Sequence, residues 1–277
     1  MPAPCSEQPD SARGSPLQSV GVSQTRTRAS GLTQEQLAQY REDGFLIITE
    51  SLLLDDDVAF ARDRIDCLFV RWRTLPRRLA PAAATGDGPA PIARIHRLTA
   101  LDPVMAHCRL LETCRGMAAA IIGVKKAWCC FDAAVYRHAG AGSVEWHQDF
   151  ATSTMGTPKR SVHFWIPLND HFADAGSLVF VPGSHRNGLA KHRLGTRLSR
   201  LATHTAEVTD GATTVSVPLS VGSFSIHTAW TTHGSSPNRT DQTRKSLVLE
   251  FSPGPWSAAR EIGPALVNSL LARSRAG

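Results

Sequence analysis

The first part of the chain has the spacing of apolar and polar positions that is typical of helices. Thr33 and Gln36 form a capping box, in which the two side chains satisfy each other's backbone N–H groups. Leu37 and Tyr40 then place an apolar stripe on the helix that follows, and Gly44 ends it. The same pattern predicts three further elements, which are a short strand over 45–49 and helices over 56–73 and 102–122.

Short runs of apolar and β-branched residues, separated by turn residues, replace the helical pattern after Gly123. Several such runs in sequence indicate an all-β sandwich or jelly roll. We therefore expect an all-β core with flanking α-helices, the helices preceding the β region in the chain. The predicted strands cover residues 127–136, 143–150, 161–168, 178–181, 214–218, 223–227 and 246–251.

The first 31 residues differ in composition from the rest. They are rich in Ser, Pro, Gln and Thr and nearly lack large apolar side chains, so burial cannot offset the entropy cost of ordering them. A chain of 277 residues with 42% hydrophobic residues is long enough for one domain with a sizeable core. We predict a disordered tail over residues 1–31 and a single domain over 32–277.

Composition and charge indicate where the protein is located and which classes of partner it binds. No stretch approaches the ~20 consecutive apolar residues of a membrane span, and the N-terminus lacks the pattern of a signal peptide. The six cysteines match no paired zinc-ligand spacing, which favours free thiols and a cytoplasmic location. The formal net charge is +6, but the basic residues are scattered, so we expect a solvated surface or an anionic substrate rather than nucleic acid.

A candidate metal site lies in segment 145–150, which reads Glu-Trp-His-Gln-Asp-Phe. If this segment is a strand, His147 and Asp149 point to the same face because their spacing is two residues. An imidazole and a carboxylate side by side, with a distant second His, form the facial triad that suits non-haem Fe(II). Taken alone, a His-x-Asp pattern is weak in a chain with 11 His, and a surface pair on a strand is its plainer interpretation.

Two residues, His227 and His233, can supply the second imidazole. His233 precedes Gly-Ser-Ser-Pro-Asn, which marks a turn at the end of a strand, and a position at the rim suits an open metal site. We favour a structural or supporting role for His227. Arg244 follows His233 by eleven positions, which leaves room for a turn and a return strand. Its planar guanidinium can bind a carboxylate with two parallel hydrogen bonds, although a surface arginine is the plainer interpretation.

Further segments in the same order complete a family pattern. Each segment is weak alone, but a Pro-Gly-Ser-His block between the His-Gln-Asp and His-Gly-Ser segments is quite specific. With these segments, which run from Thr33 to Phe251, the chain resembles the phytanoyl-CoA dioxygenase family of Fe(II)- and 2-oxoglutarate-dependent oxygenases. The segments are the opening helix with Asp43-Gly44-Phe45, then Trp146-His147-Gln148-Asp149, the run 176–185 that ends in Pro182-Gly183-Ser184-His185, His233-Gly234-Ser235-Ser236-Pro237-Asn238, and Arg244.

The resemblance implies a double-stranded β-helix, also called a jelly roll and similar to the cupins, with the metal at its mouth. It also implies Fe(II), 2-oxoglutarate as cosubstrate, and O2. Residue by residue, it assigns iron to His147, Asp149 and His233, the far carboxylate of the cosubstrate to Arg244 and Ser235, and further cosubstrate contacts to Gln148, Trp165 and Arg94. Arg94 falls where some members of the family use a Lys for this contact.

We therefore expect a dioxygenase that hydroxylates an unactivated C–H bond of a small metabolite or a natural-product intermediate, with release of succinate and CO2. The family also contains epimerases, desaturases and ring-forming enzymes, which are alternatives. A zinc hydrolase could use the same ligands, but it would leave Arg244 and Ser235 without a role. A binding module with a degenerate metal site is a third alternative. We expect no nucleic-acid or membrane partner, and a chain that acts alone or as a homodimer.

Overall fold

The computed structural model places most of the chain from Gly31 onward, and the expected tail over 1–31 lies outside the described residues except for Gly31. The structure describes residues 31–49, 52–71, 92–152, 160–170, 173–194, 204–208 and 211–255. Within these ranges, no helix is both long and apolar enough to cross a membrane.

The N-terminal helix and strand confirm the prediction made from the capping box. Helix α1 (Gln34–Asp43) begins after Thr33, whose hydroxyl accepts a hydrogen bond from the backbone N–H of Gln36 at 3.1 Å. The Gln36 side chain accepts from the backbone N–H of Thr33 at 2.8 Å. Gly44 ends the helix with a φ of 80°, a left-handed conformation that glycine adopts without steric cost, and β1 (Phe45–Ile48) follows.

The expected single helix over 102–122 is wrong, because the chain divides there into two elements. These are the 3-10 helix η2 (Pro103–His107) and α4 (Arg109–Ile122), and the short helix α3 (Leu98–Leu101) precedes them. Pro103 lacks a backbone N–H and starts a new turn, and the Asp102 carboxylate accepts from the N–H of Val104 at 3.2 Å. Helix α2 (Asp55–Val70) occupies the predicted region, and α4 ends at Gly123 as expected.

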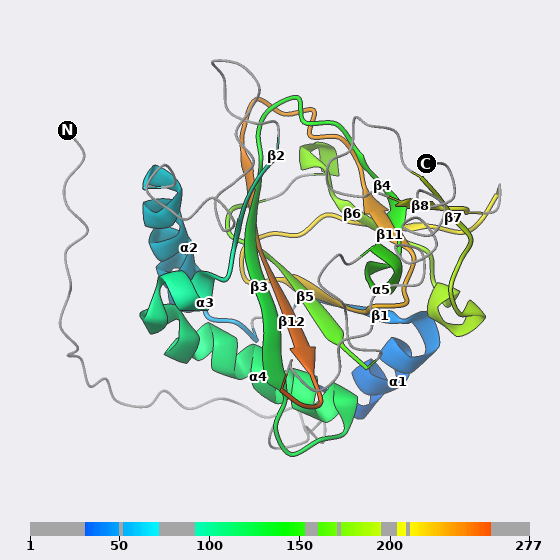
Figure 1. Cartoon of the computed structure of the whole chain (residues 1–277), viewed down its shortest axis with the longest axis horizontal. Helices are drawn as coiled ribbons and strands as arrows, with labels where there is room; N and C mark the ends of the chain where they lie inside the picture. Colours follow the sequence, from blue (N-terminus) through cyan, green and yellow to red (C-terminus); the bar gives the residue numbers. More distant parts are fainter. Residues whose placement is uncertain are drawn as a thin grey trace, which may run out of the picture.

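Two antiparallel sheets form the core, which confirms the predicted jelly roll (Figure 1). The larger sheet has the order β1-β10-β5-β12-β3-β2, and the smaller has the order β4-β11-β6-β9. Besides β1, the larger sheet contains β2 (Ile92–His96), β3 (Trp128–Arg137), β5 (Val162–Pro167), β10 (Phe224–Thr228) and β12 (Arg244–Ser252). The smaller contains β4 (Val144–His147), β6 (Leu178–Phe180), β9 (Val215–Val217) and β11 (His233–Ser235).

Several boundaries differ from the sequence-based expectation. Strand β4 ends at His147, and Asp149 begins the short helix α5 (Asp149–Thr152), so the predicted strand over 143–150 is wrong at its end. Strands β2 and β11 were not predicted, and neither was the separate pair β7 (His192–Leu194) and β8 (His204–Ala206). The remaining short 3-10 helices are η3 (Ala173–Ala175) and η4 (Ser184–Asn187).

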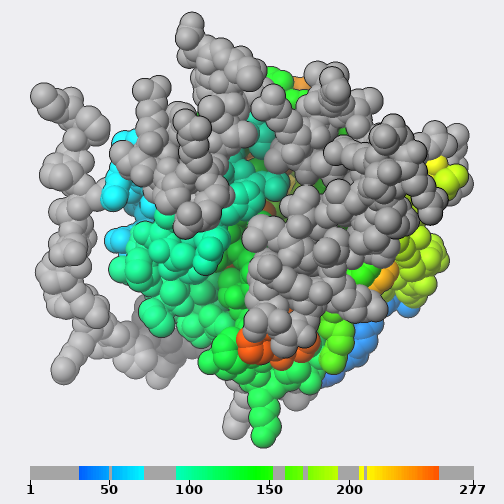
Figure 2. All heavy atoms as spheres, in the orientation of Figure 1, coloured from blue at the N-terminus to red at the C-terminus, as the bar shows by residue number. Residues whose placement is uncertain are grey.

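Two hydrophobic clusters hold these layers together. The larger cluster joins the helices to the outer face of the six-stranded sheet. Helices α2, α3 and α4 lie along that side of the molecule (Figures 1 and 2). The smaller cluster lies between the two sheets, where the rings of Phe45 in β1 and Phe180 in β6 stack at 4.6 Å. The candidate site residues lie beside this second cluster, since Phe180 also contacts the rings of His227 and His233.

The cysteines agree only in part with the expectation of free thiols. Cys108, Cys114, Cys129 and Cys130 are free, and burial raises the pKa of each thiol. Cys67 in α2 is disulfide-bonded, so the expectation is wrong for this residue. Among the described cysteines, none belongs to a group that could hold a metal ion.

Candidate metal centre

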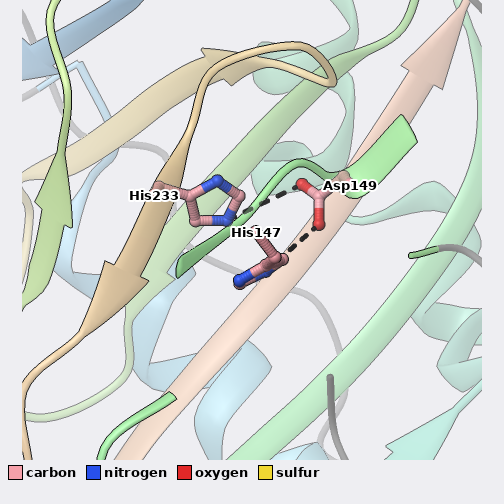
Figure 3. A group of neighbouring side chains, drawn as sticks. All are labelled: His147, Asp149 and His233. Atoms are coloured by element: carbon pink, nitrogen blue, oxygen red, sulfur yellow. Dashed lines mark ion pairs between the residues drawn. The ribbon is translucent and has the colours of Figure 1, made fainter. Parts of the chain in front are cut away.

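His147 and His233 face each other across the pairing of β4 with β11. They are direct partners in the antiparallel register, and their ring centroids lie 4.2 Å apart. Asp149 completes the group, with its Oδ1 3.6 Å from Nε2 of His147 and its Oδ2 3.8 Å from Nε2 of His233 (Figure 3). The three ligand atoms lie within 4.8 Å of one another, so the three residues can surround one ion.

Backbone carbonyls fix the orientation of both rings. Nδ1 of His147 lies 2.8 Å from the carbonyl oxygen of Glu145, and Nδ1 of His233 lies 2.9 Å from that of Thr231. A carbonyl oxygen can only accept, so each Nδ1 carries the proton and each Nε2 presents a lone pair to the centre. Burial lowers the pKa of both imidazoles to about 4, which keeps them neutral near pH 7.

The carboxyl group of Asp149 is ionised in this setting. Burial acts to raise its pKa, but the surrounding imidazoles hold the pKa well below its usual range. These imidazoles belong to His147, His163, His227 and His233. Two neutral imidazoles and one carboxylate, with the remaining positions open, are the donor set of the facial triad and fit Fe(II).

Two further histidines contact the same carboxylate. Nδ1 of His163 lies 3.1 Å from Oδ2 of Asp149, and Nε2 of His227 lies 3.2 Å from the same oxygen. His163 in β5 and His227 in β10 are direct partners in their antiparallel register. Asp149, His163 and His227 therefore make a second group that could hold an ion.

The surroundings of His163 favour the first group as the metal centre. Its Nε2 lies 3.0 Å from the hydroxyl of Ser161 and 3.8 Å from Oε1 of Glu250, while its Nδ1 faces Asp149. Both ring nitrogens thus already have partners within the protein. His147 and His233 have only one ring nitrogen bonded to the backbone and direct the other at the centre.

A buried polar group extends from β11 away from the imidazoles. Ser235 follows His233 by two residues, so their side chains share one face of the strand. The hydroxyl of Ser235 accepts a hydrogen bond from Nη1 of Arg137 at 2.5 Å. The sequence did not single out Arg137, which is the last residue of β3.

Arg244 lies opposite Arg137 at the start of β12. The two residues are direct partners in the register of β3 and β12. The guanidinium of Arg244 donates to the carbonyl oxygen of Gly176, and its Cζ lies 4.9 Å from the centroid of the Trp165 ring. The structure therefore brings Ser235 and Arg244 to Arg137, and Trp165 to Arg244.

Comparison with known proteins agrees with this geometry. The family model for phytanoyl-CoA dioxygenase matches residues 40–246, which is most of the chain and includes all three candidate ligands. The chain belongs to the phytanoyl-CoA dioxygenase family.

Individual relatives in the family are more distant. The chain is 28% identical over 170 residues to the ectoine dioxygenase of Bordetella parapertussis, a match that covers 57% of this chain and 51% of the relative. It is 28% identical over 166 residues to the ectoine dioxygenase of Nocardia farcinica, with 55% and 51% covered. The chain thus spans about half the length of these curated relatives.

Solved structures share the fold at low sequence identity. EvdO2 from Micromonospora carbonacea var. aurantiaca, complexed with 2-oxoglutarate, has a TM-score of 0.66 and 23% identity, covering 84% of this chain and 96% of that one. The non-haem carbocyclase SnoK from nogalamycin biosynthesis has a TM-score of 0.64 and 18% identity, with 80% and 85% covered. EctD from S. alaskensis with 2-oxoglutarate and 5-hydroxyectoine has a TM-score of 0.64 and 20% identity, with 84% and 86% covered.

In this member of the phytanoyl-CoA dioxygenase family, Arg94 in β2 interacts electrostatically with two of the candidate ligands. Burial lowers the pKa of Arg94, whereas the charge of Asp149 raises it. The charge of Arg94 in turn contributes to the lowered pKa of His147. Arg94 is therefore close enough to the candidate ligands to influence them, and its contact with a cosubstrate stays a prediction.

Gln148 uses its amide within the protein. Its Nε2 donates to the carbonyl oxygens of Gly188 at 2.9 Å and Trp230 at 2.7 Å, and its Oε1 accepts from the N–H of Ala190 at 2.8 Å. These bonds tie the turn between β4 and α5 to two loops and so hold His147 and Asp149, the chain neighbours of Gln148, in place. A direct contact of Gln148 with the cosubstrate also stays a prediction.

Proposed function

We propose that this protein is an Fe(II)- and 2-oxoglutarate-dependent dioxygenase whose iron is held by His147, Asp149 and His233. The observation that carries the proposal is the convergence of Nε2 of both imidazoles and the Asp149 carboxylate on one point. Each imidazole is neutral and fixed by a backbone carbonyl, and the carboxylate is ionised. Iron with 2-oxoglutarate and O2 supplies a strong oxidant in this class of enzyme, with release of succinate and CO2.

Arg244 and Ser235 would hold the far carboxylate of the cosubstrate. A guanidinium and a hydroxyl can both donate to a carboxylate, and both groups lie in the buried region that adjoins His233. Trp165 would form an aromatic wall beneath Arg244. Arg94 would lie near the metal end of the cosubstrate, and Gln148 would act by keeping β4 in position.

We also propose that the substrate is a small molecule and that the default reaction is hydroxylation. The ectoine dioxygenases among the relatives support a small-molecule substrate. The carbocyclase SnoK and the epimerase SnoN among the solved structures support the alternative of a ring-forming or epimerising member. A cytoplasmic location and a homodimer stay predictions of the sequence.

Succinate formation tests the proposed activity. The purified protein, supplied with Fe(II), 2-oxoglutarate, O2 and candidate small molecules, should produce succinate, and replacement of Fe(II) by Zn²⁺ should abolish it. A zinc hydrolase would show the opposite dependence, since Zn²⁺ needs no keto acid to activate water. Succinate that is absent with every candidate, together with hydrolysis by the zinc form, would favour the hydrolase.

A further inference from the structure

Two buried arginines occupy directly opposed positions in the larger sheet. Arg137 in β3 is 0% exposed and Arg244 in β12 is 4% exposed, and the two are register partners. Like charges in directly opposed positions of an antiparallel pair destabilise a sheet. Within the described part of the chain, no carboxylate lies within ion-pair distance of either guanidinium. The fold therefore concentrates two positive charges that the described residues do not neutralise.

Both guanidiniums reach the same small region around Gly176. Arg244 donates to the carbonyl oxygen of Gly176, and a Cβ added to Gly176 would lie 3.1 Å from Nη1 of Arg137. Arg137 also donates to the hydroxyl of Ser235 and to the carbonyl oxygen of Gly142. The Nε atoms of both arginines are buried without a hydrogen-bond partner.

An arrangement of this kind is costly without an anion. A buried charge is tolerated when it is paired, and removal of its partner leaves a penalty of several kcal/mol. The pKa values follow the same physics. Burial lowers the pKa of Arg137 to about 10, and burial together with the charge of Arg137 lowers the pKa of Arg244 well below its usual range.

We propose that Arg137 is a positioning residue of the cosubstrate site, which orients the hydroxyl of Ser235 and adds its charge to that of Arg244 at the far carboxylate. This inference rests on the proposed function. Arg137 can only donate to Ser235, so the oxygen of Ser235 accepts and its own proton is left to donate to a carboxylate. The site should therefore discriminate strongly between 2-oxo acids with and without a far carboxylate.

Calorimetric binding to the Fe(II)-loaded protein under anaerobic conditions tests the inference. The ligands are 2-oxoglutarate and 2-oxopentanoate, which has the same carbon chain without the far carboxylate. Arg137→Met should weaken 2-oxoglutarate binding about tenfold or more, as expected for loss of a charge-assisted contact, and should leave 2-oxopentanoate within about twofold. Arg137 acts through Ser235, so their effects should not add. The double variant Arg137→Met with Ser235→Ala should lose less free energy of 2-oxoglutarate binding than the two single variants lose in sum.

The conservative variant keeps the test decisive if Arg137→Met does not fold. Arg137→Lys retains the charge but not the forked geometry, so its preference for 2-oxoglutarate over 2-oxopentanoate should fall below that of the unmutated protein. An unchanged preference in Arg137→Met, or in Arg137→Lys where the Met variant does not fold, would overturn the inference. An equal loss for both ligands would overturn it too. If the unmutated protein itself binds no 2-oxoglutarate, the proposed function fails instead.

Discussion

Nε2 of His227 lies 3.2 Å from Oδ2 of Asp149, and Nδ1 of His163 lies 3.1 Å from the same oxygen. The other carboxylate oxygen, Oδ1, lies 3.6 Å from Nε2 of His147. Two imidazoles thus contact one oxygen of Asp149, which also lies 3.8 Å from Nε2 of His233, and the other oxygen lies beside His147. Groups that orient a metal ligand in this way tune its affinity without binding the metal themselves.

Replacement of His233 and of His227 should therefore have different effects on metal binding. His233→Ala removes one of the three proposed ligands and should abolish stoichiometric Fe(II) binding. His227→Ala should retain binding with an affinity reduced roughly 10- to 100-fold, the usual range for loss of a residue that orients a ligand. Metal titration of both variants measures the difference, with exposed His107→Ala as the control. The reverse order would assign the metal to the group of Asp149, His163 and His227.

Arg244→Ala should raise the apparent KM for 2-oxoglutarate far more than that for the substrate. A charge-assisted contact of this kind contributes roughly 1.5–3 kcal/mol, on the order of tenfold to a hundredfold in affinity. Arg244→Lys should recover only part of the lost affinity for 2-oxoglutarate, because an ammonium cannot make two parallel hydrogen bonds. Arg239→Ala removes an exposed arginine and serves as the control. An unchanged dependence on 2-oxoglutarate in Arg244→Ala would rule out this role.

Gly176→Ala should impair cosubstrate binding as well as stability. Gly176 has a φ of +88°, and an added Cβ would lie 2.8 Å from the backbone oxygen of Ser236 and 3.1 Å from Nη1 of Arg137. Gly140 has a φ of +73° with nothing within 4 Å of an added Cβ, so Gly140→Ala carries the backbone strain alone. Both variants should lose roughly 1–3 kcal/mol of stability from that strain. Calorimetry should find weaker 2-oxoglutarate binding in Gly176→Ala only. Equal affinities of Gly176→Ala and Gly140→Ala for 2-oxoglutarate would show that the contact with Arg137 is unimportant.

The metal-free protein should lose stability as the pH falls from about 6.5 to about 4. Burial holds the pKa of His147 and of His233 at about 4, whereas an unfolded imidazole has a pKa of about 6.5. Between these values the unfolded state binds more protons, so the free energy of unfolding rises with pH and falls with acidification. Denaturant titration across this window checks the prediction. In a double variant, His147→Gln with His233→Gln, the free energy of unfolding should depend less steeply on pH than in the unmutated protein. An identical slope in the two proteins would contradict the prediction.

The convergence of His147, Asp149 and His233 was predictable because the residue types and their order carry the information, and their role as metal ligands stays a proposal. The predicted geometry was wrong in detail, since Asp149 does not share a strand with His147. Their side chains still meet, because the turn from β4 into α5 keeps residues two apart on the same side of the site. The capping box at Thr33 was likewise a local signal, and the structure confirms it.

Features that depend on pairing between distant segments were not predictable from the sequence. Arg137 lies one residue beyond the predicted strand over 127–136, and its position opposite Arg244 follows from the register of β3 with β12. The contact of His163 in β5 with Asp149 in α5 likewise joins two segments whose approach is set by the fold. A single sequence gives spacing along the chain, whereas these relationships are set by the closure of the two sheets.

Anaerobic absorption spectroscopy of the protein with Fe(II) and 2-oxoglutarate tests most directly whether His147, Asp149 and His233 form an iron site that binds the keto acid. A chelated keto acid on Fe(II) gives a visible charge-transfer band, and neither component gives it alone. The account predicts that this band appears with the unmutated protein, saturates with both components, and is absent in His147→Ala and in His233→Ala. The account would be contradicted if the unmutated protein gave no band, or if both variants gave a band as strong as that of the unmutated protein.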